Sequence, residues 1–306
     1  TGTIGSIIVK YLLQLQTHFH VLIGGRRSIK EISMSTFYNS ERLKYNQMNY
    51  NNDVELDNFC SQCLLVINAV GPSFKINDKI ALHALRNNCH YIDIGGYGIL
   101  RDLLKPYEKS IEAQKLCFII GVGWMPGISG VFSKTIIETH LNSPENTNFN
   151  IYYGAVDNWS YSSTYDLAAS SMGKTRSYVY SHGKEIQVSP FRYTHHKFFP
   201  FIGHKKICMP SFDEQLTQLA TSLKQIRKIS TFIMLNDYIS MGKFMFIKIF
   251  YKHNLNKATL MLQDDYQRLV KKENKWGSVI CQVSKIEPER KIDTFYYLYT
   301  KNNLLY

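Results

Sequence analysis

The chain has 306 residues, of which 44% are hydrophobic and 20% are charged. This length and composition are typical of two globular domains and exclude a disordered or fibrous chain. The formal net charge of +12 would suit binding to nucleic acid, to an anionic membrane or to an anionic small molecule. A codon bias toward Lys, Asn, Ile and Tyr would explain the charge equally well. Because the Lys and Arg residues are scattered without long runs, we expect no nucleic-acid partner.

The cysteines and the apolar segments narrow the class of protein further. Six cysteines lie at irregular spacing, with one C-x-x-C pair at Cys60 and Cys63. Nothing nearby completes a zinc site, so we predict no metal and interpret both thiols as structural. Unpaired thiols favour a reducing compartment, and we expect a cytoplasmic protein.

The most apolar segment, residues 239–251, is interrupted by Lys243 and Lys248, so we predict a core helix there and no transmembrane segment.

The first 140 residues alternate between predicted strands and helices. Short apolar strands are predicted at 20–23, 43–48, 64–69, 91–94 and 116–122. Helices are predicted at 4–15, 76–85 and 128–141, with a further helical stretch to about residue 115 that Pro106 interrupts. Buried strands that alternate with amphipathic helices predict an α/β fold, a Rossmann-type doubly wound parallel sheet. Ligands of such sheets bind beyond the carboxyl ends of the strands.

The chain begins on a glycine motif that precedes the first predicted helix. Thr1-Gly2-Thr3-Ile4-Gly5 resembles the last five residues of a G-x-T-G-x-x-G loop. One glycine of such a loop lets the backbone approach a pyrophosphate, and a later one lets the helix pack on its strand. The helix N-terminus then offers N–H groups to the phosphates. We expect the natural protein to extend upstream, because the first strand of the sheet and the first glycine of the loop are missing.

The end of the strand predicted at 20–23 indicates which nucleotide binds. NAD-dependent enzymes usually carry an acidic residue about 20 residues beyond the glycine loop, where it binds the ribose hydroxyls. Here Gly24 and Gly25 are followed by Arg26 and Arg27, and the next acidic residue is Glu31. Arginine pairs with a 2′-phosphate through bidentate hydrogen bonds. We therefore predict NADP(H) as the cofactor; a pair of solvated arginines on a loop is the alternative.

Three strings in order then resemble a known family. They are LLVINAVGPSF at 64–74, IALHALRNNCHYIDIGGY at 80–97 and GVGWMPGISG at 121–130. Together they resemble the cofactor domain of saccharopine-dehydrogenase-like reductases, over roughly residues 1–140. The resemblance implies a two-domain NAD(P)(H)-dependent oxidoreductase. Members of this family reduce or form a C–N bond between an amine and a carbonyl partner, and a related group reduces enoyl lipids.

The resemblance also implies roles for residues that match the family by position. The cofactor-binding set comprises Thr1, Gly2, Thr3, Ile4, Gly5, Arg26, Arg27, Asn49, Asn68, Ala69, Val70 and Gly71. Within it, Asn49 would lie beside the adenine, and residues 68–71 would line the nicotinamide ribose. Four residues would face the substrate side: Asp93, Tyr97, Trp124 and Met125.

Residues 141–306 lack this alternation and are predicted to form a second, α+β domain for substrate binding or dimerisation. Helices are predicted at 164–180, 215–228 and 239–251, and strands at 148–156, 185–188, 276–283 and 294–300, with a turn at Gly183 and the start of a further helix at residues 301–306. Tyr180 and Lys184 match the Tyr-x-x-x-Lys of short-chain dehydrogenases. We interpret the match as chance, because Gly183 disfavours the helix that would align them. His195, His196 and His204 are expected in a surface loop.

Three functions remain open from the sequence. The first is an NADP(H)-dependent oxidoreductase acting on an imine or carbonyl group of a small molecule, with Tyr97 and Asp93 handling a proton or contacting the substrate. In the alternative for these two residues, Asp93 caps a turn and Tyr97 packs between domains. The second function is a non-catalytic NADP-binding sensor. The third is an enoyl-lipid reductase, which a membrane-facing segment 239–251 would favour. A homodimer is left open.

Overall fold

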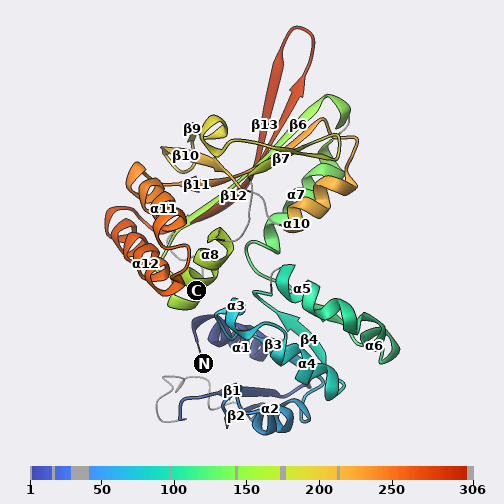
Figure 1. Cartoon of the computed structure of the whole chain (residues 1–306). Coiled ribbons are helices and arrows are strands. Elements are labelled where there is room, and N and C mark those ends of the chain that lie inside the picture. Colours follow the sequence, from blue (N-terminus) through green and yellow to red (C-terminus); the bar gives the residue numbers. More distant parts are fainter. Residues whose placement is uncertain are drawn as a thin grey trace. The chain divides into compact units, whose positions relative to one another are not determined.

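The computed structural model describes residues 2–15, 18–28, 41–96, 98–141, 144–172, 177–211 and 214–301. The chain divides into two compact units, unit 1 with residues 1–122 and unit 2 with residues 123–304 (Figure 1). The expected boundary lay after residue 140. The helix α7 (Ile128–His140) instead belongs to unit 2, because Ile136 and Ile137 are buried in a core cluster with strands of that unit.

Unit 1 contains two parallel sheets among its described residues. The first pairs β1 (Val21–Gly25) with β2 (Leu43–Gln47). The second has the order β3 (Leu65–Asn68), β4 (His90–Asp93), β5 (Phe118–Ile119). Each strand coincides with a predicted one, although the strand predicted at 116–122 is limited to two residues. The Rossmann-like α/β class is confirmed.

Short helices connect these strands. They are α1 (Thr3–Gln14), α2 (Asp53–Cys60), α3 (Ser73–Ile76), α4 (Lys79–Arg86), α5 (Gly98–Leu104), η2 (Lys105–Tyr107) and α6 (Glu108–Ala113). The predicted break at Pro106 is confirmed, since η2 separates α5 from α6. Val9 of α1 packs against Ile23 and Leu43 of the first sheet. A separate, larger cluster joins α2, α4 and α5 to β3 and β4.

Unit 2 is built on one mixed sheet. Its strands are β6 (Thr147–Val156), β7 (Tyr178–Ser181), β8 (Lys184–Gln187), β9 (His195–Phe199), β10 (His204–Pro210), β11 (Lys228–Leu235), β12 (Trp276–Ile286) and β13 (Lys291–Lys301). The main order is β13-β12-β6-β11-β10-β9, and β7 pairs with β11 and β8. Only the β6–β11 pair is parallel among these. This second sheet domain confirms the predicted fold class.

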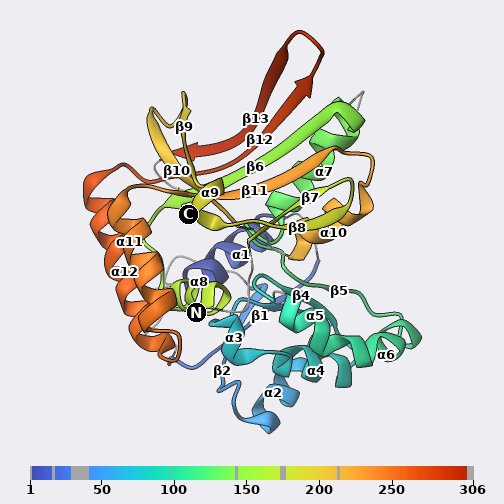
Figure 2. The same cartoon turned by 45° about the horizontal axis from the view of Figure 1, so that its top comes forward.

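Helices cover this sheet at two places, as Figures 1 and 2 show. They are α7, η3 (Pro144–Asn146), α8 (Tyr161–Met172), α9 (Pro190–Tyr193), α10 (Glu214–Ser222), α11 (Tyr238–Phe250) and α12 (Leu255–Lys272). One core cluster places α7 and α10 against Phe149, Ile151 and Tyr153 of β6. A second places α11 and α12 against β10 and β11. Tyr152 lies on the opposite face of β6, in a third cluster with Phe232 and Ile280.

Four predicted features of unit 2 need correction. The helix expected over 164–180 ends at Met172, and 178–181 form β7 instead. The aromatic and β-branched residues there, with Val179 and Tyr180 2% exposed, suit a buried strand better than a helix. The helix expected over 215–228 ends at Ser222, and Lys228 begins β11. The three histidines expected in a loop lie in β9 and β10. Lys301, expected to start a final helix, ends β13.

Candidate functional site

Three side chains at the carboxyl ends of β3 and β4 form a buried hydrogen-bonded network. Asn68 ends β3, and Asp93 lies opposite it at the end of β4. The Asn68 Nδ2 donates to Asp93 Oδ2 at 2.8 Å, and the Tyr91 Oη donates to the same oxygen at 2.5 Å. These side chains are at most 6% exposed. Burial, together with the adjacent Asp93, raises the pKa of the Tyr91 phenol, so it remains a donor.

The same network fixes the turns that follow the two strands. The Asn68 Oδ1 accepts the Val70 N–H at 3.0 Å, and the Asp93 Oδ1 accepts the Gly95 N–H at 2.8 Å. Asp93 thus accepts three hydrogen bonds from the protein, which favours the turn-capping alternative for it. Ala69, Val70 and Gly71 are exposed beyond the end of β3. They are accessible to a ligand there.

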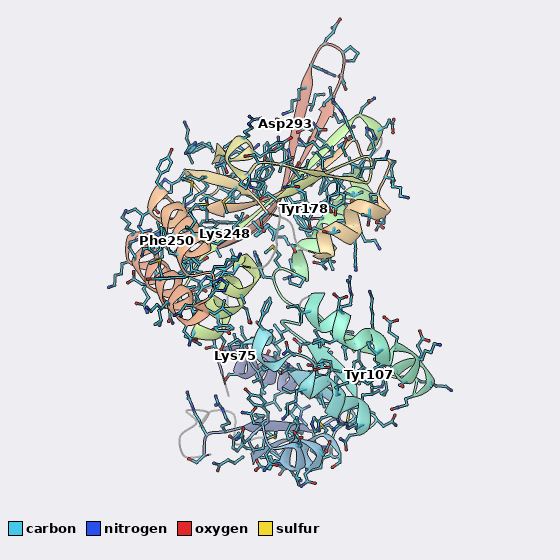
Figure 3. The ribbon with its side chains drawn as sticks, viewed as in Figure 1. Lys75, Tyr107, Tyr178, Lys248, Phe250 and Asp293 are labelled. Carbon is cyan, nitrogen blue, oxygen red and sulfur yellow. The ribbon has the colours of Figure 1, made fainter. Side chains whose placement is uncertain are left out.

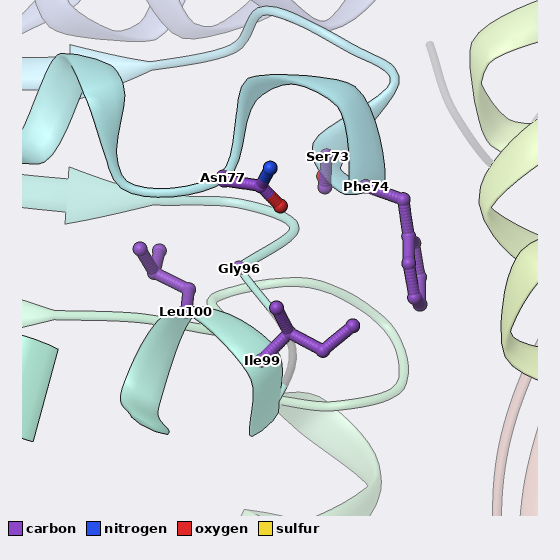
Figure 4. Close-up of a pocket in the computed structure, with 6 residues that line it drawn as sticks. All are labelled: Ser73, Phe74, Asn77, Gly96, Ile99 and Leu100. Atoms are coloured by element: carbon purple, nitrogen blue, oxygen red, sulfur yellow. The ribbon is translucent and has the colours of Figure 1, made fainter. Parts of the chain in front are cut away.

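The turn after Asp93 requires glycine at two positions. A Cβ on Gly95 would lie 1.9 Å from the Ser73 Oγ, and Gly96 has φ +40°. Figure 4 shows the small pocket beside this turn, which is lined by Ser73, Phe74, Asn77, Gly96, Ile99 and Leu100. The pocket is small and partly open to solvent. Tyr97, predicted as catalytic, lies outside the described residues.

The amino end of α1 lies beside the end of β3. A Cβ on Gly5 would lie 3.9 Å from the Cβ of Ala69, so two of the predicted cofactor residues are neighbours. Gly2 occupies the N-cap position of α1 and provides no capping side chain. The first-turn N–H groups of a helix lack partners within the helix, so those of Thr3 and Ile4 are suited to donate hydrogen bonds to phosphate oxygens. Thr1 lies outside the described residues.

Arg26 and Arg27 form an exposed turn directly after β1. Two side chains of the neighbouring strand β2 hold the backbone of this turn. The Tyr45 Oη donates to the Arg27 carbonyl oxygen at 2.5 Å, and the Gln47 Nε2 donates to the Arg26 carbonyl oxygen at 3.3 Å. The turn backbone is therefore anchored to the sheet, while both arginine residues face solvent. The sequence did not single out Tyr45 or Gln47.

Asn49 is also exposed, after the end of β2, but its side chain makes a local turn. Its Oδ1 accepts the Asn51 N–H at 3.1 Å, and its own N–H donates to Glu55 Oε2 at 2.7 Å. Asn52 caps α2 through the Val54 N–H at 3.1 Å, and its Nδ2 donates to Glu55 Oε1 at 2.7 Å. The Asn52-x-x-Glu55 spacing is a capping signature that would have predicted α2. A contact between Asn49 and an adenine stays a prediction.

Trp124 and Met125, predicted on the substrate side, belong to unit 2. Both pack against the core cluster that includes Ile136 and Phe149. The Gly127 N–H that follows them donates to the Gln215 Oε1 at 2.9 Å, which ties this loop to α10. Their role toward a substrate stays a prediction.

The other candidate constellations lack the geometry of a site. Tyr180 and Lys184 lie on the two strands of the β7–β8 hairpin, with Gly183 at φ +74° in its turn. Burial raises the pKa of the Cys60 thiol to about 12, as suits a structural cysteine. Within the described part of the chain, no three His, Cys, Asp or Glu side chains are placed to hold a metal. No described helix is long and apolar enough to span a membrane.

An uncapped helix N-terminus, glycine turns at parallel strand ends and an adjoining basic turn define a dinucleotide-binding domain. Residues 1–117 match the saccharopine dehydrogenase NADP binding domain family. The predicted resemblance is thereby confirmed for this part of the chain, which is similar to the NADP-binding domain of this oxidoreductase family. A search of curated proteins found no match.

The whole chain is similar to several solved structures. One is described as a probable dehydrogenase from Thermotoga maritima, with 8% identity and a TM-score of 0.45 over 96% of this chain and 73% of that chain. An engineered D-amino acid dehydrogenase has 10% identity and a TM-score of 0.44 over 99% and 82%. GenD2 from gentamicin A biosynthesis, in complex with NAD, has 7% identity and a TM-score of 0.43 over 96% and 70%. Similarity at this level carries no inference about the substrate.

Proposed function

We propose that this chain is an NADP(H)-dependent oxidoreductase that transfers a hydride to or from a C=N or C=O group of a small molecule. The observation that carries the proposal is the arginine turn. Arg26 and Arg27 are exposed at the carboxyl end of β1, on a backbone that Tyr45 and Gln47 hold in place. Two guanidinium groups on an anchored backbone suit a 2′-phosphate, because arginine forms charge-assisted bidentate bonds with phosphate oxygens.

The remaining roles follow the arrangement of unit 1. The first-turn N–H groups of α1 and the close pair Gly5 and Ala69 would hold the pyrophosphate. The bound nicotinamide supplies or accepts the hydride, so the protein must orient it and manage one proton. We keep Tyr97 as the residue that handles this proton. Asp93 is assigned a positioning role, because its carboxylate already accepts three protein hydrogen bonds.

Two further parts of the proposal concern the setting of the reaction. An NADP-binding sensor would keep the same cofactor residues without turnover, so NADPH consumption with candidate amines and carbonyls separates the sensor from the enzyme. A cytoplasmic location is also proposed, on the basis of six cysteines that are all free.

A specific observation favours a second candidate, a reductase of lipid substrates. The exposed side of α11 is apolar: Ile239, Phe246, Ile249 and Phe250 are 52%, 40%, 65% and 65% exposed. Their spacing places them on one stripe of the helix. An exposed apolar stripe of this kind is typical of contact with a partner or a lipid surface. Figure 3 labels Phe250 and Lys248 on this helix.

The first test of the proposed function is cofactor preference. We expect NADPH to bind at least tenfold more tightly than NADH, since one arginine–phosphate contact contributes about 1.4 kcal/mol or more. In Arg26→Ala/Arg27→Ala the affinity for NADPH should fall by about that factor, while the affinity for NADH should stay the same. Fluorescence titration measures both.

The matched control is Lys105→Ala/Lys109→Ala, which removes two exposed cations of the same unit at η2 and α6. It lowers the net charge equally and should leave both affinities unchanged. Equal affinities for NADPH and NADH in the unmodified protein would contradict the arginine argument.

A further inference from the structure

Strand β13 is a long edge of the unit 2 sheet, and its central residues 294–300 carry no charge. It has 11 residues and pairs with β12 along its whole length, and among the described residues it ends the strand order of the sheet. The strands β8 and β9 also lie at edges of this sheet. They have only 4 and 5 residues and carry charged or histidine side chains. Short, charged edges resist pairing with other strands, whereas long apolar edges invite it. Figures 1 and 2 show the β12–β13 hairpin extending past its neighbours.

The backbone groups that β13 offers can be assigned from the hairpin turn. The Glu287 N–H donates to the Arg290 carbonyl oxygen at 3.0 Å, so this pair is hydrogen-bonded. Because bonded and non-bonded pairs alternate in an antiparallel ladder, even-numbered residues of β13 direct their backbone groups toward β12. The Leu298 carbonyl oxygen agrees, since it accepts a bond from the Ser278 Oγ of β12 at 2.8 Å. Odd-numbered residues 291–301 therefore direct theirs outward.

The side chains of this edge are apolar and firmly held. Phe295, Tyr297 and Leu298 are 41%, 52% and 39% exposed. The Tyr297 ring stacks on Phe201 with centroids 4.2 Å apart, and the Lys197 Nζ lies 5.0 Å from the centre of the Phe295 ring. No residue from 294 to 300 is charged. Ordered aromatic side chains lose little conformational entropy on association.

The charged residues on either side of this apolar stretch attract each other when a second β13 is placed antiparallel to the first by a two-fold rotation. With the axis at Tyr297, the outward groups of β13 face those of a second antiparallel β13. Phe295 then lies opposite Tyr299, and Asp293 lies opposite Lys301. Moving the axis to residue 296 would instead place Lys291 opposite Lys301, which is repulsive. Asp293 is labelled on the hairpin in Figure 3.

We propose that β13 pairs antiparallel with β13 of a second copy of this chain, about a two-fold axis at Tyr297. The pairing joins the two unit 2 sheets into one continuous sheet and satisfies the outward backbone groups of both strands. An isologous contact of this kind closes at two copies. The proposal is independent of the proposed function, because it uses residues of unit 2 alone and no cofactor.

Sedimentation of the full chain over a series of concentrations tests this inference. We expect a dimer whose dissociation constant rises about tenfold in Lys301→Glu, because two symmetry-related attractive pairs become repulsive. The double variant Asp293→Lys/Lys301→Glu restores opposite charges and should return the constant to within about threefold. Lys184→Glu makes the same charge change on the exposed edge strand β8 and should have no effect.

A backbone variant tests the pairing itself. Tyr297→Pro removes an outward N–H and leaves the β12–β13 ladder intact, so it should give a folded monomer; circular dichroism checks the fold. If this variant does not fold, the charge variants decide. A monomer at every concentration would overturn the proposal. The proposal would also be overturned if Lys301→Glu and Lys184→Glu weakened the dimer equally. The same holds if the double variant did not restore the dimer affinity that Lys301→Glu loses.

Discussion

A tyrosine hydroxyl on β2 forms one of the two hydrogen bonds that hold the backbone of the arginine turn. The Tyr45 Oη donates to the Arg27 carbonyl oxygen at 2.5 Å, and Tyr45 also packs against the small core under α1. The phenol therefore links the sheet to the turn that would bind the 2′-phosphate. Its removal leaves the arginine charges in place and loosens only their backbone.

We expect Tyr45→Phe to lower the affinity for NADPH by about three- to tenfold, because one neutral hydrogen bond contributes about 0.5–1.5 kcal/mol. The affinity for NADH should stay the same, since NADH has no 2′-phosphate. Fluorescence titration of both nucleotides measures the ratio, and Tyr11→Phe on the exposed side of α1 is the control. An equal loss for NADPH and NADH would show that Tyr45 only stabilises the domain.

For single residues, the sequence predicted the positions of the site residues better than their roles. Asn68 and Asp93 were expected at the ends of β3 and β4, and they lie there, opposite each other. The sequence did not reveal that Tyr91, two positions before Asp93 on the same side of β4, would complete a buried network. Tyr45 was equally hidden, because its partner is a backbone carbonyl, which leaves no pattern in the sequence.

Among the helices, α11 has an uncommon distribution of side chains. Its buried side includes Phe244 and Ile247, and its exposed side is also apolar. The Phe246 and Phe250 rings lie with centroids 4.5 Å apart on the exposed side. A helix that is apolar all round normally has both sides covered, so this surface should bind an apolar partner or a lipid.

We expect the chain to co-sediment with vesicles that contain anionic lipid, because its net charge of +12 adds to the apolar contact. Phe246→Ser/Phe250→Ser should weaken binding at least tenfold, since each buried phenylalanine contributes about 1.5–3 kcal/mol. Val54→Ser/Leu64→Ser, at side chains 68% and 77% exposed in unit 1, is the control. If the two variants bind equally, the lipid candidate loses its support.

Elements with strong periodicity were predicted, and elements fixed by tertiary pairing were not. The helix expected over 239–251 matches α11 within one residue. By contrast, β9, β10 and β11 were missed, although they form three of the six strands in the main order of the unit 2 sheet. Their Lys, His and Ser residues interrupt the apolar pattern. One of them, Lys206, is 1% exposed and is compensated by Asn236 and Glu273 at 2.7 and 3.1 Å. Such compensation is not visible in the sequence.

At the scale of the whole molecule, each unit has hydrophobic cores of its own. The clusters of unit 1 contain only residues before 122, and those of unit 2 contain only residues after 123. The sequence predicted the boundary one helix further along the chain, because α7 follows a strand as a Rossmann helix would. The side chains of α7 decide its place, since Ile136 and Ile137 pack with β6 and β12 residues.

This division predicts that unit 2 folds alone. A chain of residues 123–306 should show a cooperative thermal transition by circular dichroism, because its clusters are complete without unit 1. Addition of NADPH at about 100 times its dissociation constant should stabilise unit 1 of the full chain by about 2.7 kcal/mol and leave the fragment unchanged. Two outcomes would contradict the division: a fragment without a cooperative transition, or a fragment that NADPH stabilises as much as the full chain.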